Sequence, residues 1–220
     1  MFYEPDREPH GLAHNPFKSC IVPRPIGWIT TLKGDGKVNL APFSQFNLIG
    51  YEPGYVGFSA SVHPPDWRGK DSVQHVERSG EFVYNMATYD LRDKVDLTSQ
   101  IIESDIDEMQ AAGLTPAPGR TVKTPRVAES PVAFECKHFT TVFLPGNTVE
   151  TRHYLVIGRV VGVYIADEAI GADGKLDIPK IKPLARMGYT DYTYVDKVFP
   201  MKLMNKAIEA RWKFGLHGGR

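Results

Sequence analysis

The sequence has few cysteines, no surplus of either charge and no long apolar run, and each of these absences excludes a class of protein. Its 220 residues include only Cys20 and Cys136, which are too few and too far apart for a disulfide scaffold or a structural zinc site. The 26 basic and 26 acidic residues cancel, which disfavours a nucleic-acid-binding role that would need a basic surface. Because no stretch of eighteen apolar residues occurs, we expect no membrane span.

The first residues contain no apolar segment of the kind that marks a secretory signal. We therefore expect a cytoplasmic protein whose two cysteines stay reduced. Burial in the core, rather than a role as catalytic thiols, is the favoured interpretation of both, since neither has a histidine or a basic cluster beside it in sequence.

The common catalytic motifs are also missing. The chain has no G-x-G-x-x-G, no phosphate-binding G-x-x-x-x-G-K-[ST], no G-x-S-x-G and no H-E-x-x-H. His10 and His14 stand four residues apart, but they bracket a glycine in a proline-rich arm, so a solvated terminus is favoured over a metal site. No metal site and no catalytic residue are predicted.

What the chain does contain is typical of a globular protein of one or two domains, with 42% hydrophobic and 11% aromatic residues. The pattern favours a mainly β protein with helices, because strands seldom alternate with helices along the chain. β-branched and aromatic runs predict strands at 26–32, 38–40, 55–60, 81–87, 132–143 and 154–165. Apolar spacing predicts helices at 71–80, 90–103, shortly before 113, and 201–214. A closed antiparallel barrel with inserted helices fits this order best.

Turn-forming residues refine the prediction. Residues 33–37 (KGDGK) indicate a tight hairpin, and Pro42 limits the returning strand to a sheet edge or an early end. Asp71 and Gly80 are the expected caps of the helix at 71–80, and Ser104 with Asp107 resembles a weak capping box. Four prolines between 114 and 131 predict a surface excursion, and the glycines within 154–165 predict a bulge.

Polar residues gather at the predicted strand ends between 24 and 71. A threonine pair, two serines and a lysine at a helix start are the groups that a phosphate monoester requires, because hydroxyls, a cation and first-turn N–H groups all donate to it. The alternative is structural: Asp71 and Ser72 only cap a helix, and Thr30 and Thr31 only favour a strand. The spacing alone leaves both open.

Five segments in this order resemble the flavin reductase-like family of FMN-binding split-barrel proteins, which includes flavoredoxin. They are RPIGWITT, NLAPFSQFN, FSAS, KDS and GEFVYN, and the similarity continues through HYLVIGRVVGV to PLARMGY. The resemblance implies a six-stranded split β-barrel, homodimeric, with one FMN per subunit near the interface. It implies an N-terminal arm at 1–20, a split-barrel domain at 21–190 and an unmatched C-terminal extension with a helix at 191–220.

The resemblance also implies which residues hold FMN. Thr30 and Thr31 are expected by the ribityl-phosphate, and Asn39 with the following loop along the ring. Arg186 and Tyr189 are further neighbours of the ring. Phosphate contacts are expected from a serine pair, a lysine and the helix start. The implied set is Thr30, Thr31, Asn39, Ala41, Pro42, Phe43, Ser44, Gln45, Ser59, Ser61, Lys70, Asp71, Ser72, Arg186 and Tyr189. Gln45 stands where the family commonly has Phe or Tyr, and KDS replaces the usual KDT.

The leading functional hypothesis is an FMN-dependent oxidoreductase reduced by NADH or NADPH as a transient donor. Electrons would pass to free flavin, a flavin-using partner enzyme or another acceptor. The first alternative is an FMN-holding electron carrier that ignores pyridine nucleotides, and the second is a non-flavin binding module on the same fold. For His63, His138 and His153, structural packing is favoured over a chemical role.

Overall fold

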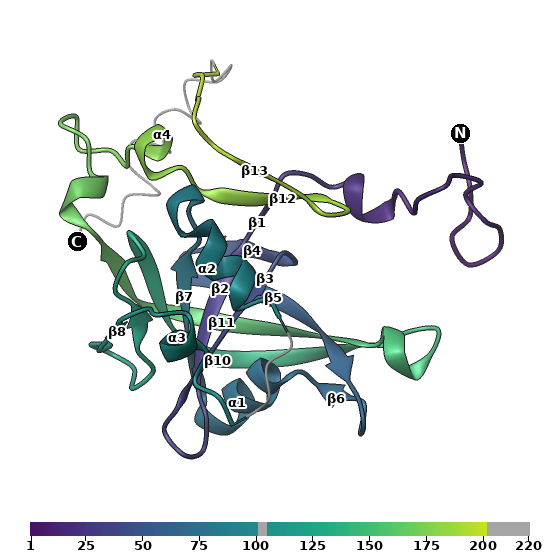
Figure 1. Ribbon diagram of the computed structural model, residues 1–220, viewed down its shortest axis with the longest axis horizontal. Helices are drawn as coiled ribbons and strands as arrows, with labels where there is room; N and C mark the ends of the chain where they lie inside the picture. The colour runs from purple at the N-terminus through teal and green to yellow at the C-terminus, as the bar shows by residue number, and fades with distance from the viewer. Residues whose placement is uncertain (101–104, 202–220) are drawn as a thin grey trace.

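The structure, a computed structural model, describes residues 1–100 and 105–201. Its largest element is an antiparallel sheet of eight strands (Figure 1). In chain order these strands are β2 (Gly27–Leu32), β3 (Val38–Phe43), β4 (Phe46–Tyr51), β5 (Gly54–His63), β6 (Arg68–Gly69), β7 (Glu81–Met86), β10 (Val132–Leu144) and β11 (His153–Ile165). The expectation of a mainly β chain with helices is confirmed.

The smaller elements surround this sheet. A three-stranded sheet is formed by β1 (Arg24–Pro25), β12 (Leu184–Gly188) and β13 (Asp191–Tyr194), and a two-stranded one by β8 (Pro116–Ala117) and β9 (Arg126–Val127). The α-helices are α1 (Asp71–Ser79), α2 (Arg92–Leu97), α3 (Glu108–Ala111) and α4 (Ile178–Ile181). Single 3-10 turns lie at Phe17–Ser19, Tyr89–Leu91, Val149–Thr151 and Asp167–Ala169.

The closed barrel was a wrong prediction for the described residues, because the sheet does not close. Its hydrogen-bonded path runs β3-β2-β7-β10-β11-β5-β4, with β6 pairing to β5 beside it. The two end strands, β3 and β4, are consecutive in sequence and joined only by Ser44 and Gln45. One bond, from the Ser59 N–H to the Gln45 carbonyl at 2.8 Å, holds this corner to β5. The sheet therefore bends around its core and stays split where the chain crosses from one edge to the other.

The sequence analysis did not predict the two-residue strands β1, β6, β8 and β9, nor three longer strands, each of which lacks the pattern of a buried strand. β4 exposes most of its residues, and β12 and β13 are short and partly exposed. The predicted edge position of Pro42 is confirmed, since β3 ends the path and a proline costs no sheet hydrogen bond on its free side. The predicted bulge is confirmed by register shifts between β10 and β11 at Glu135/Cys136 and His138/Thr140.

The helices begin and end somewhat differently from expectation. Lys70, not Asp71, is the N-cap of α1, while Gly80 is its C-cap in the left-handed region at φ 72°. The helix expected at 90–103 is shorter, because α2 ends at Leu97 and the Trp28 indole N–H donates to the Thr98 hydroxyl just beyond it. Asp107 caps α3 through the Gln110 N–H, whereas Ser104 lies outside the described residues. The helix predicted at 201–214 falls almost entirely outside them.

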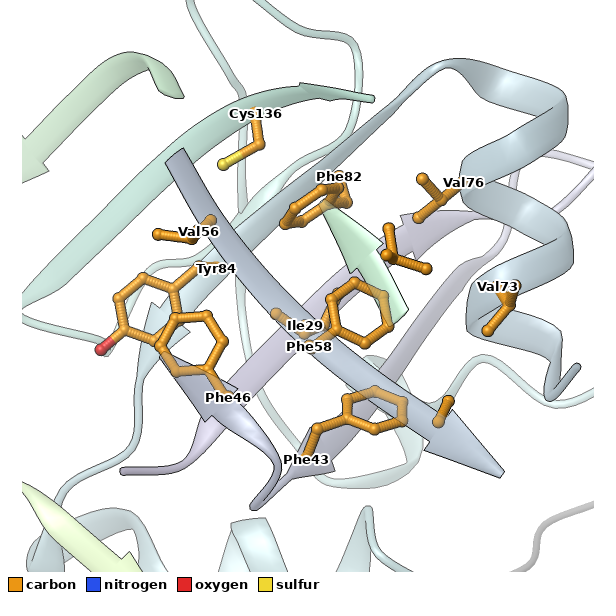
Figure 2. Packing of buried hydrophobic residues seen from close by; sticks show 12 residues of the cluster. Ile29, Phe43, Phe46, Val56, Phe58, Val73, Val76, Phe82, Tyr84 and Cys136 are labelled. Carbon is orange, nitrogen blue, oxygen red and sulfur yellow. The ribbon is translucent and has the colours of Figure 1, made fainter. Parts of the chain in front are cut away.

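The core lies between the curved sheet and α1 (Figure 2). Figure 2 shows Val73 and Val76 of the helix directed at rings from the strands, with Phe58 between Phe43 and Phe82. The Phe43 and Phe58 ring centroids lie 4.8 Å apart, and those of Phe58 and Phe82 lie 5.5 Å apart in an edge-on arrangement. This cluster fixes β3, β5 and the start of α1 relative to one another, and these are the elements from which the candidate site is built.

The proline-rich excursion predicted at 114–131 lies against the outer face of β2, β7 and β10. Two buried acidic side chains of the sheet accept its backbone N–H groups: Glu81 accepts those of Lys123 and Thr124, and Glu135 those of Arg120 and Thr121. No helix among the described residues has both the length and the apolar character needed to cross a membrane.

Candidate functional site

A cavity of about 820 Å³ lies where β3, β5 and the beginning of α1 meet. This volume is within the range of small-molecule and cofactor sites. The structure brings most of the residues implied by the resemblance to this one cavity. They are Asn39, Ala41, Pro42, Phe43, Ser44, Gln45, Ser59, Ser61, Lys70, Asp71, Ser72 and Arg186.

Helix α1 presents its N-terminus to the cavity. Its N-cap, Lys70, makes no side-chain capping bond, and Asp71 and Ser72 of the first turn both line the cavity wall. The N–H groups of a first helical turn have no partner within the helix and carry partial positive charge. The Lys70 N–H donates to the Ser61 carbonyl at 3.2 Å, which ties the helix start to the end of β5. The cavity thus has a place where an anion meets amides, hydroxyls and an ammonium group together.

A buried hydrogen bond from β3 fixes the position of Ser72 at the start of α1. The Asn39 amide donates to the Ser72 hydroxyl at 2.9 Å, so β3 and α1 are joined at the cavity floor. Thr31, the register partner of Asn39 on β2, lies 3.2 Å from the His75 ring through its hydroxyl. Burial lowers the pKa of His75, with nearby Asp71 opposing and Arg78 and Lys33 reinforcing the shift.

The segment from Ala41 to Gln45 forms the opposite wall. It is rigid for two reasons: Phe43 packs into the core against Phe58, and the Gln45 carbonyl accepts the Ser59 N–H. The chain therefore exposes a short, fixed stretch of backbone and the Gln45 side chain at the cavity, in place of a mobile loop.

The structure leaves three of the implied residues outside the cavity. Thr30 is fully buried and its hydroxyl donates to the Pro125 carbonyl at 2.8 Å, on the face that carries the excursion. Thr31 is also fully buried and lies behind Asn39. Tyr189, at φ 44°, packs its ring on His14 and accepts the Arg186 guanidinium at its backbone carbonyl, so it reaches the cavity only through Arg186. Strand alternation explains Thr30, since neighbouring residues of a strand face opposite sides.

The cavity also contains basic residues that the sequence analysis missed, namely Lys18 and Arg68. Lys18 belongs to the segment assigned to an N-terminal arm, and it is held at the cavity because Arg24 donates to its carbonyl. Arg68 pairs with Asp66 at 3.2 Å. No sequence motif marks either residue: Lys18 lies in a single 3-10 turn, and Arg68 lies on the two-residue strand β6, which pairs with the end of β5.

Four basic residues line the cavity (Lys18, Arg68, Lys70 and Arg186) against three acidic ones (Asp66, Asp71 and Glu108), so its charge is slightly positive. Asp66 pairs with Arg68, and Glu108 pairs with the buried Lys33 at 3.3 Å. Burial raises the pKa of Glu108, although Lys33 and backbone N–H groups oppose the shift. Lys18, Lys70 and Arg186 remain to attract an anionic ligand.

Two histidines line the cavity, His63 and His153. Burial lowers the pKa of His153, and the positive charges of Lys18 and Lys70 lower it further, so the ring is neutral at pH 7. Its Nδ1 lies 3.4 Å from the Ser59 hydroxyl. His138 lies elsewhere on β10 and contacts Thr141. His153 is therefore an uncharged hydrogen-bonding group beside the anion-binding end.

The remaining reactive residues lie away from this site. Cys136 is fully buried, and burial together with Glu135 raises the pKa of its thiol, while Cys20 is exposed. His10 contacts Tyr3 and His14 contacts Tyr189. In the two described ranges, no three His, Cys, Asp or Glu side chains gather in a way that could hold a metal ion.

Comparisons with known proteins agree with this arrangement. The model of the flavin reductase like domain matches residues 19–194. An uncharacterized protein of Aquifex aeolicus is 34% identical over 76% of this chain and 82% of its own length. Among solved structures, nitrilotriacetate monooxygenase component B from Bacillus cereus superimposes with a TM-score of 0.82 at 23% identity, covering 91% of this chain and 98% of that one. Flavoredoxin of Desulfovibrio vulgaris (Miyazaki F) superimposes with a TM-score of 0.71 at 20% identity, covering 91% and 99%.

Proposed function

Because the chain belongs to the family of the flavin reductase like domain, we propose that its main cavity binds FMN and that the protein is an NAD(P)H-dependent flavin oxidoreductase. The observation that carries the proposal is the convergence of Ser59, Ser61, Lys70 and the first turn of α1 on one cavity. These groups come from separate parts of the chain, and together they offer what a phosphate monoester binds.

The rest of the cavity suits the remainder of FMN. The fixed backbone from Ala41 to Gln45 lies where donors can meet the polar edge of a flat ring, and donors at that edge favour the anionic reduced flavin. When bound, FMN would supply a hydride acceptor for a dihydronicotinamide, and Ser59, Ser61, Lys70 and the 41–45 backbone would hold it in place. The protein contributes orientation and charge, since direct hydride transfer depends on geometry.

An anaerobic titration tests the proposal. Purified protein reconstituted with FMN is expected to lose its flavin absorbance near 450 nm on addition of NADH or NADPH. If FMN binds but neither nucleotide bleaches it, the protein is the electron carrier of the alternative hypothesis, which the similarity to flavoredoxin favours. If no FMN binds, both forms of the proposal fail.

The acceptor of the electrons is proposed on the same basis. The similarity in fold to component B of nitrilotriacetate monooxygenase favours delivery to free flavin or to a flavin-using partner enzyme. Reduced FMN released from the protein would be detected by the reduction of cytochrome c in a coupled assay.

Replacing Lys70 with alanine is expected to weaken FMN binding about 10- to 150-fold, because a hydrogen bond to a charged group contributes about 1.5–3 kcal/mol. Lys70 makes no capping bond, so α1 should keep its start in the variant. Quenching of FMN fluorescence measures the dissociation constant. Lys175→Ala, on an exposed loop, is the matched control. Equal affinities for Lys70→Ala and the control would contradict the placement of the phosphate.

We also propose that the protein is a homodimer. The outer face of β4, β5, β10 and β11 exposes Ile49 and Phe139, and Tyr55 packs edge-on against Phe139 at 5.2 Å. Large apolar side chains exposed on one face of a sheet favour an interaction site there. Ser59 lies on the same face of β5 as Tyr55, so a second copy would dock beside the cavity.

Light scattering at micromolar concentration is expected to show a dimer for the unmodified protein and a monomer for Phe139→Asp. A monomeric unmodified protein would contradict the proposal.

A further inference from the structure

A second, smaller cavity of about 380 Å³ lies between α2 and β13, next to the main one. Its floor is apolar, formed by the buried Val95 and Leu184. Its walls are aromatic: Tyr194 packs against Tyr89 with ring centroids 4.4 Å apart, and Tyr192 faces it from the same strand. An apolar floor between tyrosine rings suits a flat heteroaromatic ring.

The two cavities share a wall. Tyr192 lines both of them, and Arg186, which lines the main cavity, donates to the Tyr192 hydroxyl at 2.6 Å with its guanidinium 4.5 Å from the ring centroid. The end of helix α2 and the residues after it form a second shared element, because Asp96 of the helix lines the small cavity, and Thr98 and Ser99, just beyond the helix, line the main one. A ligand that passes over Tyr192 therefore meets Arg186 between the two cavities.

Acidic groups complete the small cavity. Asp93 and Asp96 lie on its rim, and Asp96 has no ion-pair partner in the described part of the chain. The rim arginine, Arg92, is already engaged: it donates to the Tyr89 carbonyl at 3.0 Å, covers the Tyr89 ring and lies 3.7 Å from Asp93. A carboxylate beside an aromatic pocket is suited to the vicinal hydroxyls of a ribose and repels a 2′-phosphate.

From these features we infer that the small cavity binds the adenosine half of the pyridine nucleotide, with Arg186 on the diphosphate and the nicotinamide in the main cavity. The identification of the ligand as the electron donor rests on the proposed function.

Binding of ADP-ribose to the FMN-loaded protein, measured by calorimetry, tests the site without turnover. The unmodified protein is expected to bind ADP-ribose, and Tyr194→Ala to bind it about tenfold more weakly or worse, because a wall of the ring site is lost. Tyr194→Phe keeps the ring and should bind as the unmodified protein does. Asp96→Asn changes an exposed residue and should weaken binding a few-fold, whereas Asp90→Asn, exposed on the neighbouring turn, should not. The inference would be overturned if the unmodified protein did not bind ADP-ribose. It would also be overturned if Tyr194→Ala and Asp96→Asn both bound ADP-ribose as tightly as the unmodified protein does.

Turnover with two donors separates this inference from the proposed function. Tyr194→Ala should raise KM for NADH about tenfold and leave the rate with 1-methyl-1,4-dihydronicotinamide, which lacks adenosine, unchanged. If NADH bleaches the flavin but its KM is the same in Tyr194→Ala, the small cavity is not the adenosine site and the proposed function stands. If ADP-ribose binds and Tyr194→Ala loses it while neither donor bleaches the flavin, the adenosine site stands and the reductase function fails.

Discussion

Phe82→Ala is expected to lower the free energy of unfolding by about 3–5 kcal/mol, the range for truncating a buried phenylalanine. Phe82 is fully buried on β7 and belongs to the cluster shown in Figure 2, with the Phe58 ring edge-on to it at 5.5 Å. Gly158 on β11 has no side chain at this point, and a Cβ there would lie only 2.3 Å from the Phe82 ring. The ring fills this space, and the surrounding strands are too constrained by their pairing to close the hole.

Urea unfolding and the melting temperature measure the effect. A change of this size corresponds to a fall in melting temperature of about 6–20 °C for a protein of this length. Phe199→Ala is the matched control, because that side chain is 81% exposed and its removal should change stability by less than about 0.5 kcal/mol. A loss for Phe82→Ala no larger than the control's would mean that the cluster repacks freely.

Glu81→Ala is expected to destabilise the protein by about 3 kcal/mol. Its carboxylate accepts the N–H groups of Lys123 and Thr124 at 2.6 and 2.8 Å and pairs with the Lys137 ammonium at 2.7 Å. Removing it leaves the buried Thr124 N–H and the part-buried Lys123 N–H without this acceptor, and an unpaired buried donor costs about 1–3 kcal/mol. Glu81→Gln, which keeps an acceptor oxygen but not the charge, should lose less.

The Glu81 contribution should also depend on pH. Burial alone would raise the pKa of Glu81, but the Lys137 ammonium and the donors of the 123–124 backbone outweigh it, so the pKa lies below its ordinary value of 4.5. A carboxyl with a depressed pKa stabilises the fold fully above 4.5 and loses that contribution as the pH falls through its folded pKa. The stability difference between the unmodified protein and Glu81→Gln is therefore expected to narrow below pH 4.5. A difference that stays constant from pH 7 to pH 3 would contradict this assignment.

Phe82 and Glu81 affect function because the packing and hydrogen bonds that they make stabilise the strands around the cavity. Phe82 and Phe58 support Phe43 and with it the rigid wall from Ala41 to Gln45, and the Glu81 network fastens the excursion over the opposite face of the sheet. A stability loss at either site is expected to reduce the fraction of protein able to bind FMN. The Lys70→Ala test should accordingly be run well below the melting temperature of every variant.

Residues 24–87 illustrate how far local pattern goes. The glycines of residues 33–37 predict the hairpin there, because glycine tolerates the positive φ that a tight turn needs. The structure agrees, since Gly36 adopts φ 86°. α1 was foreseen because Val73 and Val76 share a face and Gly80 can end the helix in the left-handed region. β4 was not foreseen, because its outward side chains show no alternation with a buried face.

The sequence by itself determined the class of the fold and, through the order of five motifs, the family and twelve of the residues that line the cavity. Sequence patterns are enough to predict the strands and helices, because turns, caps and strand alternation depend on residues close together in the chain. Only the tertiary structure decided that the sheet stays open, that Thr30 faces the excursion instead of the cavity, and that Lys18 and Arg68 join the basic groups. Lys18 is held at the cavity by Arg24, and Arg68 by the short pairing of β6 with β5. The other two features depend on which distant strands pair and in what register, since a shift of one residue would reverse the face of every side chain. The small cavity beside Tyr192 has the same origin, since β13 and α2 meet only after the chain between them has folded.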